Sequence, residues 1–186
     1  MVDTVLFHSA LGLTPGVREL AAALGATGAR VHVPDLFDGE TFAELAAGVA
    51  KRDALGIPEL MRRAAAAVAE VPPDCAYIGL SMGAAAAEWL AVTRAGARAV
   101  VLAHGALPLG AMGATAWPGV PLQVHASERD PWVDLAVARE LVAAANGELF
   151  TYPGAGHVFT DASAPEYDAS SAALLRERVL KLMRGL

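Results

Sequence analysis

A serine flanked by glycines, in the pentapeptide Gly79-Leu80-Ser81-Met82-Gly83, is the first candidate for chemistry in this sequence. It lies between an apolar, strand-like run at 75–78 and an alanine-rich, helix-like run at 84–92. Such a turn strains the serine backbone and lifts the hydroxyl above the strand ends, and only small neighbours allow the close approach of strand and helix. It also aims the Met82 backbone N–H, at a helix N-terminus, at any oxyanion formed on the serine. The pattern predicts a nucleophile, and a plain turn in which Ser81 caps the helix is the alternative.

A serine hydroxyl attacks a carbonyl only when a neighbouring base takes its proton. His157, in a glycine-rich turn after the strand-like run at 148–152, is the candidate base, and Asp130, in the loop after the run at 122–126, is the candidate acid. Ligands of open α/β sheets bind at the carboxyl ends of the strands, where all three side chains are expected. The order Ser, Asp, His along the chain is that of α/β-hydrolases. In this arrangement His157 acts as general base and acid, while Asp130 orients its imidazole.

Two roles have competing candidates. Glu128 and Asp134 are alternatives for the acid, but Glu128 lies nearer the strand and Asp134 falls inside a helical pattern, so Asp130 is preferred. A second oxyanion donor is expected in the loop after the first strand-like run, with the Ala10 backbone N–H as first choice and that of Ser9 as second. Taken singly, an aspartate before a proline is often a helix cap, and a histidine in a glycine-rich turn is often solvated.

Six apolar, β-rich runs alternate with helix-like segments and provide the elements that would position these residues. The runs are 4–7, 30–33, 75–78, 99–103, 122–126 and 148–152, and the helices are expected at 17–24, 41–51, 58–70, 84–92 and 132–145. Nearly continuous apolar runs are typical of strands buried on both faces, which predicts a parallel sheet between two helical layers. Residues 1–186 are expected to form one α/β domain. A helical excursion at about 36–73 is longer than a single crossover needs, and whether it acts as a lid stays open.

Composition limits the partners. The 186 residues carry a formal net charge of −6 with scattered basic residues, so neither nucleic acid nor an anionic membrane is expected as a partner. The apolar runs are too short to span a bilayer, and the N-terminus lacks a basic leader region, which favours a cytoplasmic protein. The one cysteine, Cys75, has no disulfide partner and is expected to be buried. Without clustered ligand residues or a glycine-rich phosphate loop, neither a metal nor another cofactor is expected.

Several segments carry a closer resemblance. They are Ser9-Ala10-Leu11-Gly12-Leu13, Gly79-Leu80-Ser81-Met82-Gly83-Ala84, Ser127-Glu128-Arg129-Asp130-Pro131, Tyr152-Pro153-Gly154-Ala155-Gly156-His157-Val158-Phe159 and Tyr167-Asp168-Ala169. With them the chain resembles the dienelactone hydrolase family of α/β-hydrolases. The resemblance implies a three-layer α/β-hydrolase fold with about six mostly parallel strands in the order 2-1-3-4-5-6. It also implies Ala10 and Met82 as oxyanion donors, and hydrolysis of an ester or lactone.

The chain departs from the founding members of that family at several positions. They carry a cysteine where this chain has Ser81 and an acid where it has Ser9, so the thiol chemistry of their resting state cannot apply. They also use arginines to hold a substrate carboxylate, one of them shortly after the histidine, whereas Val158-Phe159-Thr160-Asp161 follows His157 here. The antiparallel strands that precede the oxyanion-loop strand in the family are also expected to be lacking. The chain therefore resembles a minimal member with a general esterase-like activity.

The segment 105–120 is apolar and rich in glycine and proline, which suits a loop that lines a substrate pocket. Leu11, Phe37, Trp132 and Phe159 are expected to contribute to the same apolar pocket, with core packing as the alternative for each. The expected function is a serine hydrolase that acts on a small-molecule ester or lactone, as a monomer or homodimer. A catalytically silent binding module of the same fold, or an acyltransferase that uses the same triad, is the alternative.

Overall fold

Six strands form one sheet within residues 2–186, the part of the chain described by the structure, which is a computed structural model. They are β1 (Asp3–Phe7), β2 (Arg30–His32), β3 (Ala76–Leu80), β4 (Ala99–Ala103), β5 (Leu122–Ser127) and β6 (Glu148–Tyr152). Their order across the sheet is β2-β1-β3-β4-β5-β6, and every neighbouring pair is parallel. The predicted parallel sheet and its strand order are confirmed.

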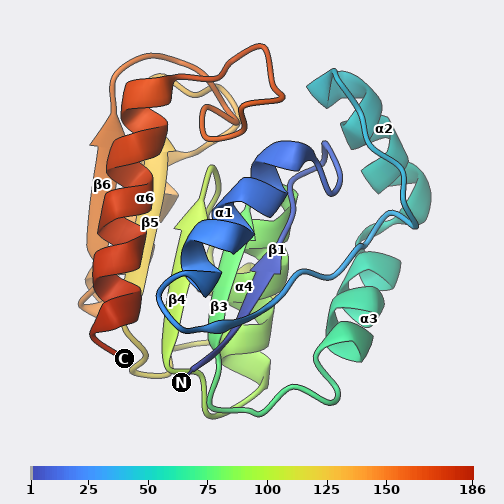
Figure 1. The fold of residues 1–186 in the computed structure, drawn as a ribbon. Coiled ribbons are helices and arrows are strands. Elements are labelled where there is room, and N and C mark those ends of the chain that lie inside the picture. The colour runs from blue at the N-terminus through green and yellow to red at the C-terminus, as the bar shows by residue number, and fades with distance from the viewer. Residues whose placement is uncertain (1) are drawn as a thin grey trace.

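Helices cover both faces of the sheet (Figure 1). Helices α1 (Pro15–Gly25) and α6 (Ala169–Arg184) pack on one face. Helices α3 (Ile57–Ala67), α4 (Met82–Thr93) and α5 (Leu135–Ala145) pack on the other, and α2 (Leu45–Leu55) precedes α3 on the β1 side. The fold thus has three layers, with the predicted helical excursion present as α2 and α3.

The sequence of the central strands explains why they lie in the middle of the sheet. Every residue of β3, β4 and β5 is buried. In β4, Val100 and Leu102 join the apolar cluster on the α4 face, while Val101 and Ala103 join the cluster on the α1 and α6 face. The unbroken apolar run of β4 suits a strand that is covered on both faces, because successive side chains point to opposite sides. In β5 the buried polar residues Gln123, His125 and Ser127 each form a hydrogen bond.

Helix starts differ from the expected ones for local reasons. Helix α5 begins at Leu135 rather than at 132, because the Asp134 carboxylate caps it by accepting a hydrogen bond from the Ala136 N–H at 2.8 Å. Asp134, expected inside the helix, is therefore its cap. Helix α2 begins at Leu45 rather than at 41, because residues 41 and 42 pair with residues 11 and 12 of the loop after β1 through an antiparallel bridge. The 105–120 segment also contains a short 3-10 turn, η1 (Leu109–Met112).

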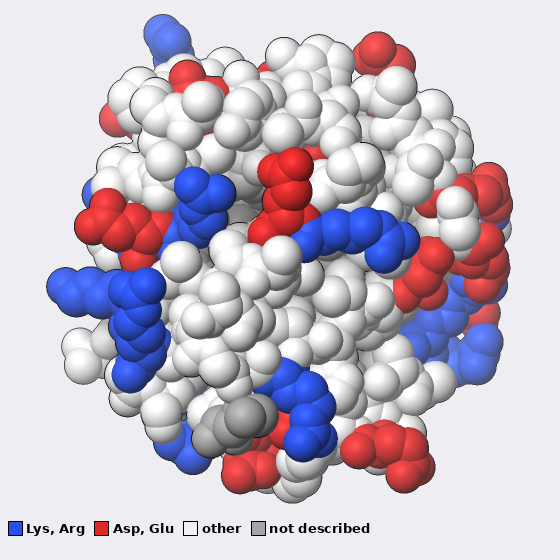
Figure 2. Space-filling model, viewed as in Figure 1, with Lys and Arg blue, Asp and Glu red and all other residues white. Residues whose placement is uncertain are grey.

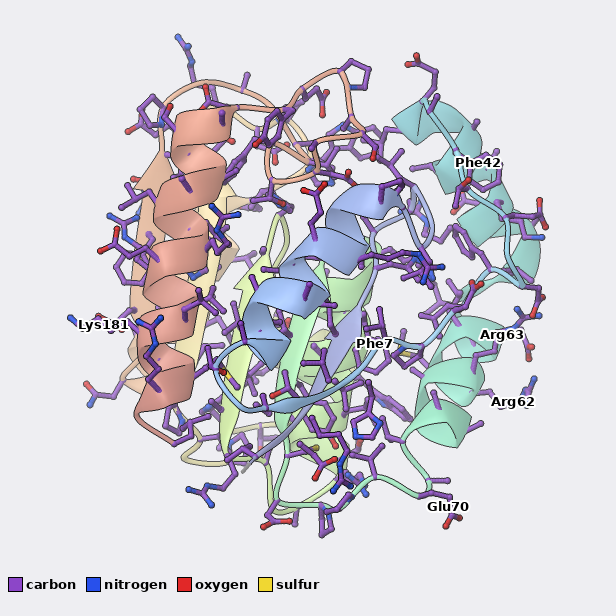
Figure 3. The ribbon with its side chains drawn as sticks, viewed as in Figure 1. Phe7, Phe42, Arg62, Arg63, Glu70 and Lys181 are labelled. Carbon is purple, nitrogen blue, oxygen red and sulfur yellow. The ribbon has the colours of Figure 1, made fainter. Side chains whose placement is uncertain are left out.

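Polar contacts join α3 to the loop after β2. Arg63 on α3 donates to Glu59 Oε1 at 2.8 Å, to Asp38 Oδ2 at 2.7 Å and to the Leu36 carbonyl at 2.9 Å. Its neighbour Arg62 binds the same Glu59 carboxylate, and both arginines project from the outer side of α3 (Figure 3). The hydrogen bonds from Arg62 and Arg63 lower the pKa of the Glu59 carboxyl to about 2. The bonds from Arg63 to Asp38 and Leu36 hold α3 against a loop that also supports the site described below.

The surface on the α1 and α6 side mixes both signs of charge. Figure 2 shows acidic and basic side chains interspersed on this face, with uncharged surface between them. Among residues 2–186, no helix combines the length and the apolar character needed to cross a bilayer.

Candidate active site

The turn between β3 and α4 has the strained geometry predicted for it. Ser81 has φ 52° and ψ −111°, a conformation that residues other than glycine rarely adopt, and its N–H donates to the Ala103 carbonyl at 2.7 Å. A Cβ on Gly79 would lie 2.2 Å from the Gly83 carbonyl oxygen, and one on Gly83 would lie 2.5 Å from the Phe7 carbonyl oxygen. Both glycines are therefore required by close backbone approach, and together they leave the Ser81 side chain at the carboxyl end of the sheet.

Ser81, His157 and Asp130 form one hydrogen-bonded chain. Ser81 Oγ lies 2.7 Å from His157 Nε2, and His157 Nδ1 lies 2.8 Å from Asp130 Oδ2. Because a carboxylate only accepts hydrogen bonds, we assign the imidazole proton to Nδ1, which leaves Nε2 to accept from the serine hydroxyl. Asp130 Oδ1 accepts from the Trp132 N–H at 2.9 Å, so both carboxylate oxygens are held. The three residues chosen from the sequence are thus brought together, each from the end of a different strand.

The histidine loop is anchored to its surroundings by further polar contacts. The Glu166 carboxylate accepts the N–H groups of His157 and Val158 at 3.1 and 3.3 Å. Ser127, at the end of β5, donates its hydroxyl proton to the Gly156 carbonyl at 2.6 Å. These contacts hold the loop from both sides, so the imidazole keeps its place between the serine and the acid.

His104 lies beside His157 and is electrically neutral at physiological pH. Burial lowers its pKa well below the ordinary value, and the charges of His157 and His125 lower it further. Its Nε2 is 2.7 Å from Thr160 Oγ1, and its ring centroid is 6.1 Å from that of His157. The indole of Trp132 lies on the same imidazole, with centroids 5.8 Å apart. A neutral neighbour matters here because a second positive charge would oppose protonation of His157.

The loop after β1 begins beside the turn that carries Ser81, where a Cβ on Gly83 would lie 2.6 Å from the His8 carbonyl oxygen. Two hydrogen bonds to Ser9 stabilise the turn of this loop. The Ser9 Oγ accepts from the Leu11 N–H at 3.1 Å, and the Ser9 carbonyl accepts from the Gly12 N–H at 3.1 Å. The N–H groups of Ser9, Ala10 and Met82 have no hydrogen-bond partner within residues 2–186. Met82 is the first residue of α4, so its N–H also carries the positive end of the helix dipole. These are the properties of a site that binds an oxyanion.

His8 and α2 hold that loop in place. His8 Nδ1 donates to the Ser9 carbonyl at 2.7 Å, and Nε2 accepts from the Leu36 N–H at 2.9 Å. Burial lowers the pKa of His8, which favours the neutral ring that these two bonds require. From the other side, a Cβ on Gly48 of α2 would lie 1.8 Å from the Ala10 carbonyl oxygen, so only glycine fits there. The excursion therefore supports the loop after β1 directly.

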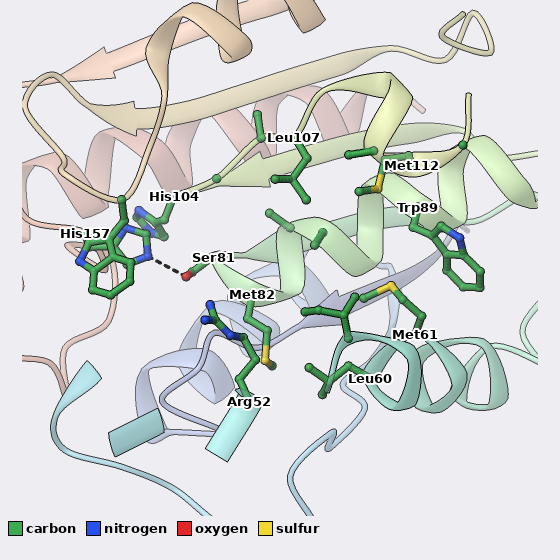
Figure 4. A pocket seen from close by; sticks show the side chains of 18 residues that line it. Arg52, Leu60, Met61, Ser81, Met82, Trp89, His104, Leu107, Met112 and His157 are labelled. Carbon is green, nitrogen blue, oxygen red and sulfur yellow. Dashed lines mark hydrogen bonds between the residues drawn. The ribbon is translucent and has the colours of Figure 1, made fainter. Parts of the chain in front are cut away.

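A cavity of about 750 Å³ opens at the serine (Figure 4). Its lining is mostly apolar and comes from α2, α3, α4, the loop after β4 and the histidine side of the site. The lining residues are Arg52, Ile57, Leu60, Met61, Ser81, Met82, Ala84, Ala85, Trp89, His104, Gly105, Ala106, Leu107, Ala111, Met112, Gly113, Trp132 and His157. The loop after β4 lines the pocket through its first half, as expected.

Three of the four residues expected to contact substrate do not line this cavity. Leu11, Phe37 and Phe159 are buried in the core, at 1%, 0% and 2% exposure, so that part of the prediction was wrong. The loops that carry them turn inward: Phe37, for example, packs edge-on against His8 with ring centroids 5.2 Å apart. Trp132, the fourth, lines the cavity and is 53% exposed.

Sequence reasoning missed the residues that shape the cavity far from the serine. Leu60 and Met61 come from α3, and Ala85 and Trp89 from α4. One signal was available: Ser81, Ala85 and Trp89 follow one another at a spacing of four, which places them on one face of a helix. Nothing in the sequence indicated that α3 would pack over this face.

Glu88 was also missed, and it is the one acidic residue in α4. It is completely buried, its Oε2 accepts from the Leu107 N–H at 3.0 Å, and its Oε1 has no partner among the described residues. Burial raises its pKa to about 7, although the Leu107 hydrogen bond acts in the opposite direction. Glu88 thus ties the cavity-lining loop after β4 to the helix that follows the serine.

Within residues 2–186, no three His, Cys, Asp or Glu side chains are grouped so that they could hold a metal ion. Ser81 and His157 line the cavity, and Asp130 lies behind His157, on its Nδ1 side. Unpaired backbone N–H groups lie at the start of α4 and in the loop after β1. That set is suited to acyl transfer, in which the serine attacks a carbonyl, the imidazole moves the proton and the N–H groups hold the oxyanion.

Two comparisons with known proteins found matches. A model of the dienelactone hydrolase family matches residues 3–186. The structure of a dienelactone hydrolase-like promiscuous phosphotriesterase from metagenomic libraries superposes with a TM-score of 0.84 at 24% identity, covering 100% of this chain and 87% of that one. For a dienelactone hydrolase from Anabaena variabilis the TM-score is 0.69 at 20% identity, with coverages of 99% and 86%. No curated protein matches the sequence. At these identities the solved structures show the shared fold.

Proposed function

This chain belongs to the dienelactone hydrolase family, and from that premise we propose that it is a serine hydrolase cleaving a small carboxylic ester or lactone through an acyl-enzyme on Ser81. Membership of the family supports a hydrolase. The observation that carries the finer proposal is the pair of hydrogen bonds, at 2.7 and 2.8 Å, that joins Ser81 to His157 and His157 to Asp130. A nucleophile within reach of a base, itself oriented by a third group, is the arrangement that activates serine.

Acylation begins when Ser81 Oγ forms a bond with the substrate carbonyl carbon and its proton passes to His157 Nε2. Asp130 stabilises the imidazolium and keeps Nδ1–H pointing toward itself. The tetrahedral intermediate collapses when the bond from carbon to the leaving oxygen breaks, and His157 returns the proton to that oxygen. With a lactone the leaving oxygen stays attached to the acyl group, so the ring opens.

Deacylation repeats these steps with water as the nucleophile. Water gives a proton to His157 Nε2 as its oxygen bonds to the acyl carbon, and collapse returns the proton to Ser81 Oγ and releases the carboxylic acid. In both halves the oxyanion is held by the Met82 N–H and by a donor from the loop after β1, for which we propose Ala10. One such donor is typically worth about 2.7 to 4 kcal/mol of transition-state stabilisation.

The nucleophile in the turn between β3 and α4 is a serine rather than a cysteine, and this makes the base His157 essential. A serine hydroxyl is far less acidic than a thiol, so it depends on proton transfer to His157 at the moment of attack. The side chain of Ser9 supports this reading, since it is turned onto the Leu11 N–H and places no negative charge near the oxyanion site.

We also propose a reducing, cytoplasmic location, because the single cysteine, Cys75, is buried.

Hydrolysis of p-nitrophenyl acetate and butyrate tests the proposal, with Ser81→Ala and His157→Ala as variants. The wild type is expected to release nitrophenolate with a kcat/KM at least about 10³-fold above that of either variant. The exposed Ser170→Ala on α6 is the matched control and is expected to keep wild-type activity. Equal rates for wild type and Ser81→Ala would reject Ser81 as the nucleophile. Folded wild type without turnover would favour a catalytically silent binding module instead.

A further inference from the structure

Helix α4 is exposed along a single line that starts at the serine. Ser81, Ala85 and Trp89 are half-buried, whereas the residues between them are buried. Their spacing of four places them on one helical face, and all three line the cavity. The cavity floor therefore begins at Ser81 and runs along the helix, with the small Ala85 in the middle and the indole of Trp89 at the far end.

The two walls of this trough are apolar. Leu60 and Met61 of α3 form one wall, and Leu107 and Met112 of the loop after β4 form the other (Figure 4). Methionine side chains are flexible and polarisable, which suits a wall that must fit an alkyl chain. A permanently charged side chain occurs once in the described lining, at Arg52, whose guanidinium is paired with the carboxylate of its neighbour at 2.8 Å.

The cavity mouth is also apolar. Five large apolar side chains are counted as exposed within residues 2–186, and three of them line this cavity: Ile57 at 54%, Leu107 at 37% and Trp132 at 53%. Single exposed apolar side chains are common on protein surfaces, but several around one opening indicate a site that binds an apolar ligand.

The position of His157 decides which part of an ester enters the trough. His157 Nε2 must give a proton to the leaving oxygen, so the leaving group has to lie on the His157 side of Ser81. Figure 4 shows His157 at one end of the cavity and Trp89 at the other, with Ser81 near His157. The acyl part, which stays on Ser81, is therefore the part directed along α4.

The length of the trough sets the length of the chain it can hold. From Ser81 to Trp89 the helix rises about 12 Å, at about 1.5 Å per residue. An extended alkyl chain advances about 1.25 Å per carbon, the projection of a C–C bond of about 1.5 Å. After allowance for the thickness of the Trp89 ring, about eight carbons fill the distance.

On the basis of the function proposed above, we propose that the acyl group of the substrate is an unbranched, uncharged alkyl chain of about eight carbons, held in the trough between α3 and the loop after β4. Ala85 keeps the trough open and Trp89 closes it. The site is therefore selective for medium-chain acyl esters. A small lactone that carries a carboxylate would leave most of the apolar cavity empty.

A chain-length series of p-nitrophenyl esters from acetate to dodecanoate tests this proposal, with Ala85→Leu as the variant that narrows the trough one helical turn from Ser81. For the wild type, kcat/KM is expected to rise roughly two- to fourfold per methylene up to about octanoate and to fall for dodecanoate. In Ala85→Leu the ratio of octanoate to acetate is expected to fall at least about tenfold. Ala66→Leu, on the exposed side of α3 and outside the cavity, is the matched control and should keep the wild-type ratio.

Failure of this proposal and failure of the proposed function give different results. If acetate is the best substrate and Ala85→Leu leaves the ratio unchanged, the acyl trough is rejected while the esterase stands. If no ester is turned over, the trough is tested by titrating Ser81→Ala with octanamide and following tryptophan fluorescence. Saturable binding that weakens at least about tenfold in the Ser81→Ala, Ala85→Leu double variant supports the trough, and absence of binding overturns it.

Discussion

The buried carboxyl of Glu88 is predicted to make the free energy of unfolding depend on pH. Glu88 has no exposed surface and lies in α4 among apolar side chains. Its carboxylate accepts a hydrogen bond from the Leu107 N–H. Burial raises its pKa from 4.5 to about 7. The folded state therefore binds this proton more tightly than the unfolded state does, so the protonated carboxyl favours folding. That contribution is fully present below pH 4.5 and is lost as the pH rises through 7.

The size of the effect follows from the two pKa values. Each pKa unit corresponds to about 1.4 kcal/mol, so between pH 5 and pH 8 the wild type should lose about 2 to 3 kcal/mol of unfolding free energy through this one group. Glu88→Gln removes the ionisation but keeps an oxygen that can accept the Leu107 N–H. The variant should therefore lack this loss, whatever its stability at pH 5.

The assay is urea unfolding of wild type and Glu88→Gln at intervals from pH 5 to pH 8. Subtracting the two profiles removes every other titrating group and leaves the contribution of Glu88. The exposed Glu140→Gln on α5 is the matched control, and its profile should run parallel to that of the wild type. If wild type and Glu88→Gln also give parallel profiles, the raised pKa of Glu88 is refuted.

Two further substitutions test how the site is held. Asp130→Asn should lower kcat by a factor on the order of 10³ to 10⁴ with little change in Tm, because an amide favours the wrong imidazole tautomer. A kcat within tenfold of the wild type would contradict the role given to Asp130. Gly48→Ala should lower kcat by a factor on the order of 10² to 10³, because its Cβ would lie 1.8 Å from the Ala10 carbonyl oxygen and displace the oxyanion loop. Wild-type kcat in a folded Gly48→Ala protein would show that α2 does not position this loop. The kcat of both variants is measured with a p-nitrophenyl ester, and their Tm is measured by thermal unfolding.

The strands and the positions of Ser81, Asp130 and His157 could be predicted because they depend on local pattern. An unbroken apolar run such as β4 can only be buried on both faces, and the carboxyl ends of parallel strands meet at one edge. Residues that follow those ends at short distance therefore converge, whatever the details of the loops. The start of α5 was missed because a helix cap depends on one side chain, and Pro131 suggested an earlier start than Asp134 sets.

The cavity could not be predicted in the same way, because its shape depends on packing between elements distant in sequence. Whether Leu11 and Phe37 face a pocket or the core is decided by the path of their loops, which the antiparallel bridge to residue 41 and the hydrogen bonds of His8 determine. The wall formed by Met61 depends on how α3 docks on α4. Neither contact leaves a periodic signal in the sequence.

The most direct test of the central claim is the site at which a fluorophosphonate reacts. After incubation of the folded wild type, peptide mass spectrometry is expected to find the phosphonyl adduct on the peptide that contains Ser81, at one adduct per chain. Labelling should be lost in Ser81→Ala and strongly slowed in His157→Ala, since the hydroxyl attacks only when Nε2 takes its proton. Labelling of Ser81→Ala at the wild-type rate, or an adduct on another residue of the wild type, would contradict the account.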